Sequence, residues 1–464
     1  MQFPEHIRSL SPKLAFIERI EPIVCSWRVQ SGLLSLVAKR TVNTRARELT
    51  RNLRDMAWKL MPMERPRPGQ VVILAHAATP STIGTVLPVM RHLAEDGRPA
   101  FLVTNAKTRK YLGLKLHSGH ADVRQIAAYS GALCQRETVI RAREIADMLA
   151  EFFPGEDTAS WLKVGLAMRS ATESWIGNAK VIVTDSDAEA YRKGFVLGAA
   201  NAGVPAIILQ QGLWGQNHFP IHAAKAFCWG PHFCAEAERC GVDPGTLEAI
   251  GCPRFDHLPS IRTAPKSPSL YHAMGKQSGR PLVLIVSNAH AQPLYRQFFD
   301  CYFKTVEALA MSKCDLVVKL HPAEPGLTAY REHLSPAAFN RLRILPSSVG
   351  LEQAIVHSDV IFQGFSTAAV EAMLLGLPVL FEEGDPTLPK ICDFPDYGGG
   401  VWCTGSQAAE ACMALACDGA ERRRVMDSQA AFLERAVVNQ GCATAAVCKR
   451  LEGVETPARY VLAH

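Results

Sequence analysis

The stretch Val317-Val-Lys-Leu-His-Pro322 is a β-branched run that stops at a histidine and a proline. Such residues favour a buried strand, and proline cannot continue the hydrogen-bonded ladder of a central strand. Further along stands Gly364-Phe-Ser-Thr-Ala-Ala-Val-Glu371, in which a glycine turn and two hydroxyl residues lead into an apolar helix with one carboxylate. Strands that end in polar turns and lead into helices predict a parallel α/β sheet with its polar groups at one edge.

The polar groups of these two stretches predict an anion site. Backbone N–H groups at the helix start, with the hydroxyls of Ser366 and Thr367, would receive a phosphate, although the same residues are also ordinary helix caps. His321 can hydrogen-bond a phosphate or protonate a departing one, and Glu371 can accept hydrogen bonds from a ribose. Lys319 alternates with His321 along the strand, so it either adds charge to this site or lies at the surface. We therefore expect the nucleotide of an activated sugar to bind here.

The hydrophobic pattern alternates between strands and helices over most of the chain. In the first half we expect a helical section over 136–175 and buried strands at 71–75, 100–103, 180–184 and 205–210. In the second half, strands are expected at 281–286, 315–321, 343–345, 360–362 and 378–381, followed by a helical stretch over 419–453. This alternation predicts two doubly wound, Rossmann-like domains that leave one cleft between them.

The predicted boundaries follow from changes in composition. Residues 263–280 are polar and rich in Pro, Ser and Gly, which is typical of a linker. The expected parts are a basic helical extension (1–62), a Rossmann-like acceptor domain (63–262), the linker (263–280), a Rossmann-like nucleotide-sugar domain (281–435), and a C-terminal helix and tail (436–464).

In the first domain, several polar residues follow predicted strands. Asp185 and Asp187 are the best carboxylates for deprotonating an acceptor hydroxyl, although aspartates are also common in turns. His76, just past the first strand, is a second base candidate. On the acceptor side we also expect Gln211 and Gly212, Trp214 as a stacking plane, and Arg254, which either clamps a phosphate or pairs with Asp256. The residues expected to hold the donor nucleotide are Ser287, Asn288, Lys319, His321, Pro322, Gly364, Ser366, Thr367 and Glu371.

Composition narrows the class of protein. With 464 residues, 48% of them hydrophobic and 20% charged, the chain is globular. It has neither an apolar run of about 18 residues, as a spanning helix needs, nor a secretory leader pattern, so we expect it in the cytoplasm. The 14 cysteines show no Cys-x-x-Cys spacing, and reduced thiols without a metal are expected.

The basic residues are unevenly distributed. Residues 1–62 carry 11 basic and five acidic residues, while the whole chain has a net charge of +6. A basic helical segment can bind the anionic inner face of a cell membrane peripherally, but it can also be solvated or packed on the body of the protein. Nucleic acid is not expected as a partner, because no aromatic stacking set accompanies the basic residues.

Five motifs together resemble bacterial surface-polysaccharide transferases of the GT-B fold. They are Gln211-Gly212, Trp229-Gly230, Gly251-Cys-Pro-Arg-Phe-Asp256, His321-Pro322 and Gly364–Glu371. The likeness covers residues 65–450. It is greatest to capsule-type Kdo transferases and CDP-glycerol glycerophosphotransferases, and bacterial sialyltransferases share the His-Pro and Ser-Thr pairings.

The resemblance implies that His321, Ser366 and Thr367 contact the phosphate of a cytidine nucleotide, and that Asp185 or Asp187 is the acceptor base. Relatives commonly have Gln-His-Gly where this chain has Gln-Gln-Gly at 210–212. That departure weakens the glycerophosphotransferase alternative most.

The function predicted from the sequence is therefore a metal-independent glycosyltransferase without a cofactor. It would move a sugar, such as Kdo or another nonulosonate, from a CMP-sugar to a surface-glycan or lipid-linked acceptor. The alternatives are a CDP-glycerol-type glycerophosphotransferase, an isomerase like the UDP-sugar 2-epimerases, and a non-catalytic nucleotide-binding subunit.

Overall fold

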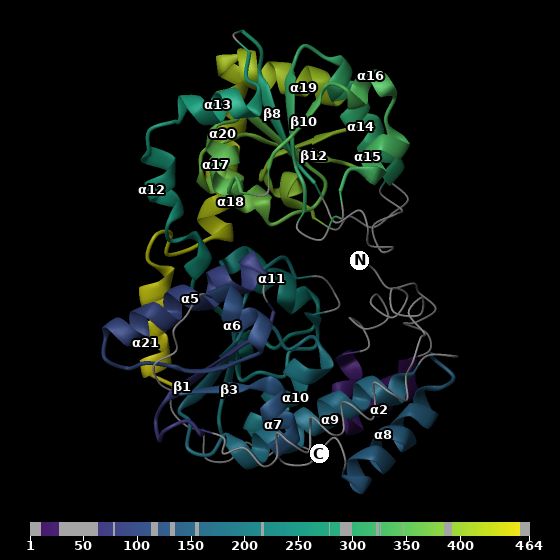
Figure 1. Cartoon of the computed structure of the whole chain (residues 1–464), viewed down its shortest axis with the longest axis vertical. Helices are drawn as coiled ribbons and strands as arrows, with labels where there is room; N and C mark the ends of the chain where they lie inside the picture. The colour runs from purple at the N-terminus through teal and green to yellow at the C-terminus, as the bar shows by residue number, and fades with distance from the viewer. Residues whose placement is uncertain are drawn as a thin grey trace. The chain divides into compact units, whose positions relative to one another are not determined.

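The chain divides into two compact units (Figure 1). The first unit comprises Gln2–Arg254 and Val438–His464, and the second comprises Phe255–Val437. The computed structural model describes residues 11–26, 64–77, 79–112, 119–129, 135–153, 157–214, 218–277, 279–287, 299–321, 324, 326–346, 348–384 and 392–454.

The first unit is built on a parallel sheet of seven strands in the order β3-β2-β1-β4-β5-β6-β7. Its central strands are buried on both faces, which is why they are continuous apolar runs rather than alternating ones. The strands are β1 Val71–Ala75, β2 Phe101–Thr104, β3 His120–Asp122, β4 Val181–Thr184, β5 Ala206–Leu209, β6 Lys225–Cys228 and β7 Leu247–Ala249.

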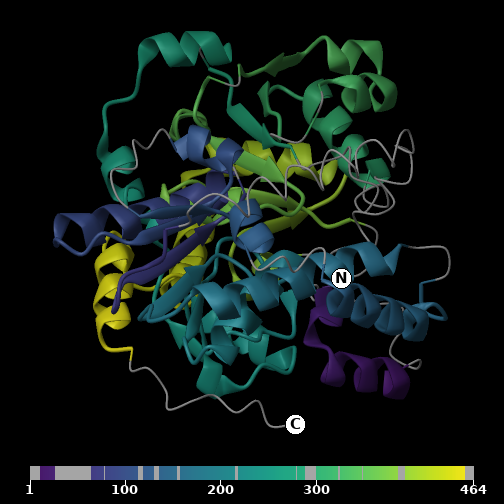
Figure 2. The ribbon, with the colours of Figure 1, turned by 60° about the horizontal axis from the view of Figure 1, so that its bottom comes forward.

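Helices cover both faces of this sheet. One core joins the strands to α5 (Pro80–Glu95), α6 (Ala106–Leu112) and α21 (Ala443–Glu452). A second core lies among α2 (Ser11–Ile20), η1 (Pro22–Ser26), α8 (Arg136–Leu149), α9 (Thr158–Trp175) and α10 (Ala190–Asn201), and Figure 2 shows α2 beside α8. The remaining elements are α7 (Val123–Tyr129), α11 (Pro231–Arg239) and η3 (Pro244–Thr246), and η4 (Pro253–Phe255) includes the boundary between the two units.

The second unit is built on a parallel sheet of six strands in the order β10-β9-β8-β11-β12-β13. Figure 1 shows α14, α15 and α16 on one side of it and α17, α18 and α20 on the other. The strands are β8 Leu282–Val286, β9 Asp315–Lys319, β10 Leu342–Ile344, β11 Val360–Gln363, β12 Val379–Glu382 and β13 Val401–Cys403. The helices are α12 Leu258–Thr263, α13 Pro268–Met274, α14 Phe299–Met311, α15 Thr328–His333, α16 Pro336–Phe339, α17 Leu351–Val356, α18 Ala368–Leu374, η6 Phe394–Tyr397, α19 Gln407–Cys417 and α20 Gly419–Ala436.

The predicted fold class, with two doubly wound parallel sheets, is confirmed. Of the N-terminal extension, α2 and η1 lie within the described residues and pack on the first unit. None of the described helices has both the length and the apolar character needed to cross a bilayer.

Two segments differ from the sequence interpretation. Residues 263–280, expected as a linker, contain α13 and are bound to the second unit, where Ser267 N–H donates to His357 Nε2 at 2.7 Å and Lys276 pairs with Asp359. The helical stretch expected over 419–453 is two helices, α20 and α21. Because Val447 of α21 lies in the core of the first unit, the chain returns there after completing the second.

Candidate functional site

Three neighbouring strands of the second sheet end in residues that the sequence singled out. β8 leads to Ser287, β9 to His321, and β11 to the turn 364–367. β8 lies between β9 and β11, so the strand order reverses beside it. Open α/β sheets bind ligands at such a switch point, outside the carboxyl ends of the strands. The local topology therefore brings these three groups to one edge.

Glu324 holds the turn that carries His321. Its Oε2 accepts a hydrogen bond from the His321 backbone N–H at 2.7 Å, and its own N–H donates to the His321 carbonyl at 2.9 Å. Its Oε1 accepts from the Ser287 hydroxyl at 2.8 Å, which ties the turn after β9 to the end of β8. Sequence reasoning missed Glu324, although a carboxylate three residues after a strand-end histidine was a usable signal.

Ser287 belongs to an internal network and does not face the solvent. Its side chain is buried, and its hydroxyl accepts from the Tyr330 hydroxyl at 2.8 Å, which in turn lies 3.0 Å from the Tyr302 hydroxyl. Burial raises the pKa of both tyrosines, so they remain neutral hydrogen-bonding groups. Ser287 therefore supports the turn at His321, in place of the predicted direct contact with a nucleotide.

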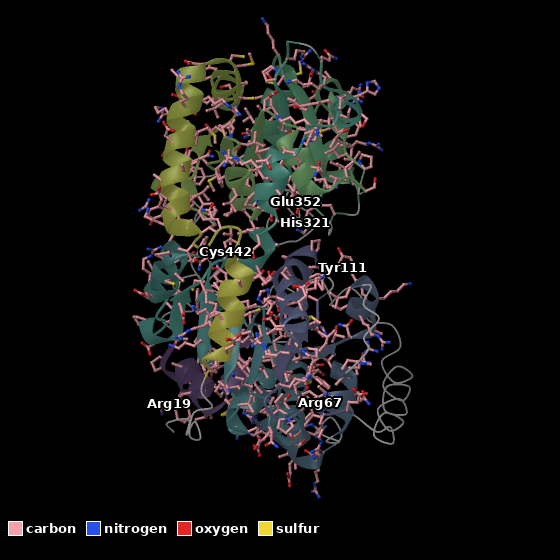
Figure 3. The ribbon with its side chains drawn as sticks, turned by 90° about the vertical axis from the view of Figure 1, so that its left-hand side faces the viewer. Arg19, Arg67, Tyr111, His321, Glu352 and Cys442 are labelled. Carbon is pink, nitrogen blue, oxygen red and sulfur yellow. The ribbon has the colours of Figure 1, made fainter. Side chains whose placement is uncertain are left out.

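His321 itself is exposed (Figure 3). Partial loss of water around the ring lowers its pKa, so the free protein holds a neutral imidazole that can donate a hydrogen bond but carries no charge. Lys319, expected beside it, donates from Nζ to the carbonyls of Pro346 at 3.2 Å and Val349 at 2.7 Å. Its ammonium group thus holds the segment after β10.

The turn after β11 leads directly into α18. Ser366 Oγ accepts from the Ala368 N–H at 3.2 Å, whereas Thr367 makes no side-chain capping bond. Gly364, Ser366 and Thr367 are all partly accessible. Glu371 lies one turn further on and is 7% exposed. The serine therefore acts as a cap, which leaves a hydroxyl-bearing turn at the sheet edge.

Two buried polar side chains beside this turn were not anticipated. The Gln363 amide ends β11, is fully buried, and has no hydrogen-bond partner for either its oxygen or its nitrogen among the described residues. On the neighbouring strand, burial raises the pKa of Glu382 to about 7. Of its two carboxylate oxygens, Oε1 accepts from the Gly384 N–H at 3.3 Å, while Oε2 has no partner in the described part of the chain.

In the first unit, His76 leaves the end of β1 and is half-buried. Two donors fix its backbone carbonyl, Asn105 Nδ2 at 2.5 Å and Thr108 Oγ1 at 2.6 Å. Its ring centroid lies 4.0 Å from that of Tyr191. Burial, and then the charge of Arg192, lowers the pKa of His76 to about 4, so the imidazole is neutral at pH 7.

The two aspartates proposed as acceptor bases are held in internal ion pairs. Asp185 is fully buried, 3.1 Å from Arg192 Nη1, and accepts from the Thr82 hydroxyl at 2.5 Å. Asp187 is 2% exposed and lies 3.5 Å from Lys193 Nζ. In this arrangement neither carboxylate can contact an acceptor hydroxyl. Both cationic partners lie on α10, the helix that follows, and the sequence pattern did not disclose the pairing.

The segment after β5 is fixed by Gln210. Its Oε1 accepts from the Trp229 N–H at 2.9 Å, and its Nε2 donates to the Gly212 carbonyl at 3.1 Å. The Gln210 carbonyl also accepts from the Trp229 indole at 2.6 Å. Gln211 and Gly212 are partly accessible at the sheet edge, as a contact with an acceptor requires.

The remaining acceptor-side candidates are packed internally. Trp214 is 6% exposed and meets Phe219 edge-to-face at 5.9 Å, so it offers no free stacking plane to a ligand. The Arg254 guanidinium lies 5.8 Å from the Trp229 ring centroid. Two donor-side predictions, Asn288 and Pro322, fall outside the described residues.

The sequence matches no family model and no curated protein. Among solved structures, S. aureus MnaA with UDP aligns with a TM-score of 0.52 at 12% identity over 84% of this chain and 100% of that one. UDP-GlcNAc 2-epimerase from Neisseria meningitidis, bound to UDP-GlcNAc, gives 0.51 at 13% identity over 82% and 99%. Anabaena HepE in complex with UDP-glucose gives 0.51 at 14% identity over 82% and 99%. At these identities the likeness concerns the fold, which is GT-B: two Rossmann-like sheets with flanking helices.

Proposed function

We propose that this chain is a glycosyltransferase that binds a nucleotide-activated sugar in the second unit and an acceptor in the first. The observation that carries the proposal is the set of groups at the carboxyl ends of three adjacent strands, β9, β8 and β11. These strand ends bring an exposed imidazole, the hydrogen-bonded pair Ser287–Glu324 and a Gly-Phe-Ser-Thr turn to the switch point of one sheet. Such an edge suits the phosphates of a nucleotide.

In this proposal the phosphate of the donor nucleotide is bound by His321, Gly364, Ser366 and Thr367, and the ribose by Glu371. A hydrogen-bond donor on a rigid turn stabilises the charge that develops on the leaving phosphate, and it costs little reorganisation during the reaction. Glu324 supplies the rigidity, because its carboxylate bonds both the His321 N–H and the Ser287 hydroxyl.

His76 is the proposed acceptor base. It is partly accessible, leaves a strand end beside the switch point of the first sheet, and is neutral at pH 7. The buried Asp185 acts on it at a distance, because its charge raises the pKa of His76 against the lowering effects of burial and Arg192. A neutral imidazole within reach of the acceptor hydroxyl can take its proton, and with a pKa of about 4 it does so as a weaker base than an ordinary histidine.

The solved structures of the same fold support a nucleotide sugar as the donor, since they are described with UDP, UDP-glucose or UDP-GlcNAc. Within that class we retain the finer proposal of a CMP-activated Kdo or related nonulosonate and a surface-glycan or lipid-linked acceptor. We also retain transfer without a divalent ion or cofactor, and action at the inner face of the membrane.

A UDP-sugar 2-epimerase is the second candidate, because solved structures described by that activity share the fold. An isomerase that removes and returns a proton needs ionisable groups placed around one carbon atom. Here the carboxylates after β4 are buried in ion pairs, and β5 is followed by the amide of Gln210. That arrangement favours transfer, which needs one base.

Donor incubation separates these reactions. The chain is mixed with UDP-GlcNAc, CMP-sugars and CDP-glycerol, with and without glycan acceptors, and the free nucleotide and the epimeric sugar nucleotide are measured. Acceptor-dependent release of nucleotide from a sugar donor supports transfer. Formation of the epimer without acceptor supports the isomerase, and CMP release from CDP-glycerol supports the glycerophosphotransferase.

Variants test the donor site. His321→Ala and Glu371→Ala are expected to abolish turnover. A nucleotide at about 100 times its Kd stabilises the protein that binds it by about 2.7 kcal/mol, which is seen as a thermal shift. His321→Ala is expected to reduce that shift. His272→Ala is the matched control, because His272 is exposed on α13. Near-normal turnover in both site variants would contradict the proposed donor site.

A further inference from the structure

Between Asp96 and Glu137 the chain is almost free of negative charge. This stretch has a single acidic residue, Asp122, against seven basic ones: Arg98, Lys107, Arg109, Lys110, Lys115, Arg124 and Arg136. Four of these cluster on the short helices that follow β2 and β3, together with one exposed aromatic residue. We call Lys107, Arg109, Lys110, Tyr111 and Arg124 the α6 patch.

The α6 patch is exposed and its charges are not neutralised. All five side chains are exposed, and Tyr111, labelled in Figure 3, is 54% exposed. No carboxylate among the described residues forms an ion pair with any of its four cations. Asp122 is used locally, since its Oδ1 accepts from the Arg124 backbone N–H at 2.8 Å. Among the described residues the patch therefore carries a net positive charge, with four cations against the single carboxylate of Asp122.

The patch is anchored to the edge of the sheet where His76 lies. α6 and α7 begin where the parallel strands β2 and β3 end, and β2 pairs with β1. Thr108 and Asn105 both donate to the His76 carbonyl, at 2.6 and 2.5 Å. The inner residues Thr108 and Leu112 are buried, so the helix presents its cations and Tyr111 outward.

The charge of the patch reaches the proposed base. The pKa of His76 is lowered mainly by burial, then by Arg192, and additionally by the charge of Arg124. Arg109 Nη1 lies 3.1 Å from His120 Nε2, and because a guanidinium only donates, that imidazole nitrogen must accept. The outer side of α6 and the start of α7 thus form one positively charged rim beside His76.

Building on the proposed transferase activity, we infer that the acceptor carries a phosphate group, which the α6 patch binds while a sugar ring of the same molecule stacks on Tyr111. Lysine and arginine side chains bind phosphate through charge-assisted hydrogen bonds, and a flat phenol suits the apolar face of a sugar. Because α6 is fixed to the His76 carbonyl, a phosphate held there positions the rest of the acceptor relative to that base.

Phosphate binding is tested on the full chain with the triple variant Lys107→Gln/Arg109→Gln/Lys110→Gln. Its matched control, Arg143→Gln/Arg239→Gln/Arg423→Gln, removes the same charge at three other exposed sites. Binding of inorganic pyrophosphate is measured by calorimetry in the presence of excess CMP, which occupies the proposed donor site. The α6 variant is expected to bind about tenfold or more weakly, and the control like the parent. Equal binding by the two variants would overturn the proposal.

The role of Tyr111 and the source of the phosphate are tested by separate experiments. Tyr111→Ala should weaken binding of glucose 1-phosphate while leaving pyrophosphate unchanged, and an equal loss for both probes counts against stacking. Vesicles of phosphatidylcholine with phosphatidylglycerol provide a lipid surface. Vesicle binding that needs the patch, without pyrophosphate binding, would overturn a phosphorylated acceptor in favour of a membrane contact.

Failure of the transferase proposal can be recognised independently of these results. CMP- and UDP-induced thermal shifts report on the second unit and are expected to be the same in the α6 variant and its control. Absence of any nucleotide-induced shift in the parent chain contradicts the donor site alone. Loss of pyrophosphate binding in the α6 variant, with the nucleotide shift intact, supports the patch.

Discussion

Arg192 Nη1 lies 3.1 Å from Oδ1 of Asp185, and both side chains are buried within the first unit. The same nitrogen lies 3.3 Å from Glu189 Oε2. Asp185 follows β4 and Arg192 belongs to α10, so the pair joins a strand end to the helix that comes after it. The charges of Arg192 and Asp185 both act on the pKa of His76, the imidazole proposed as the acceptor base.

Removing only the cation should destabilise the first unit. Arg192→Met leaves the Asp185 carboxylate buried without its partner, and a loss of about 3–5 kcal/mol in the free energy of unfolding is expected. The double variant Asp185→Asn/Arg192→Met should recover much of it, because an uncharged pair of similar volume has no ion to desolvate. Urea unfolding measures both. Additive losses would mean that the two side chains do not interact.

Nucleotide binding should depend on pH through His321. Partial loss of water around the ring lowers the pKa of this imidazole in the free protein, and a bound phosphate raises it again. Binding therefore takes up a proton, and affinity for CMP or UDP is expected to fall as the pH rises through the pKa of the bound state. Calorimetry across the neutral range gives the profile. His321→Gln should flatten it, and an unchanged slope in that variant would exclude His321 as the titrating group.

Glu382 should make the second unit less stable at alkaline pH. Its folded pKa is raised from 4.5 to about 7 by burial, so the stability it contributes is fully present below 4.5 and is lost as the pH rises to about 7. Above that, the buried carboxylate costs up to about 3 kcal/mol. Glu382→Gln is expected to exceed the parent in unfolding free energy at pH 8 and to lose that advantage at pH 4. An identical pH dependence in both proteins would contradict the shift.

The unpaired amide of Gln363 is expected to cost stability. A buried polar group without a hydrogen bond costs about 1–3 kcal/mol, so Gln363→Leu should raise the free energy of unfolding. Because the side chain is fully buried, nucleotide affinity should not change. Chemical denaturation and a nucleotide thermal shift are measured on the same variant. Lower affinity at higher stability would instead identify the amide as a donor contact.

Close packing of α9 on α10 makes Gly194 intolerant of a methyl group. A Cβ there would lie 2.2 Å from the Gly165 carbonyl oxygen. Gly194→Ala should therefore destabilise the protein by about 1–3 kcal/mol or more, although the same change in an open helix stabilises by about 1 kcal/mol. Gly419→Ala is the control, since its nearest neighbour is Arg423 Nη1 at 3.6 Å. Thermal unfolding of the two variants should shift in opposite directions.

The sequence predicted the central strands of both sheets because they are long apolar runs. It missed β3, β6, β7 and β13, which are short or carry polar residues such as Lys225. A strand that is buried on both faces has a continuous apolar run in its sequence, which identifies it. Strands near a sheet edge bury less apolar surface, so their sequences show a weaker pattern.

The sequence predicted the positions of the candidate-site residues better than it predicted which side chains they contact. Strand ends located Ser287, His321 and Asp185 at the correct edges of the two sheets. Their contacts depend on side chains from other elements, such as Tyr330 of α15 for Ser287 and Arg192 of α10 for Asp185. A periodic pattern identifies which face a residue occupies, but it does not select which of several nearby side chains completes a hydrogen bond.

The return of α21 to the first unit has a consequence for biosynthesis. Val447, Cys448 and Leu451 complete the core under β1 and β4, yet they are translated after all of Phe255–Val437. Domains usually fold in the order in which the ribosome delivers them. Here the first unit can complete its core only when nearly the whole chain has been synthesised. The second unit, although it is translated later than most of the first, can therefore finish folding before it.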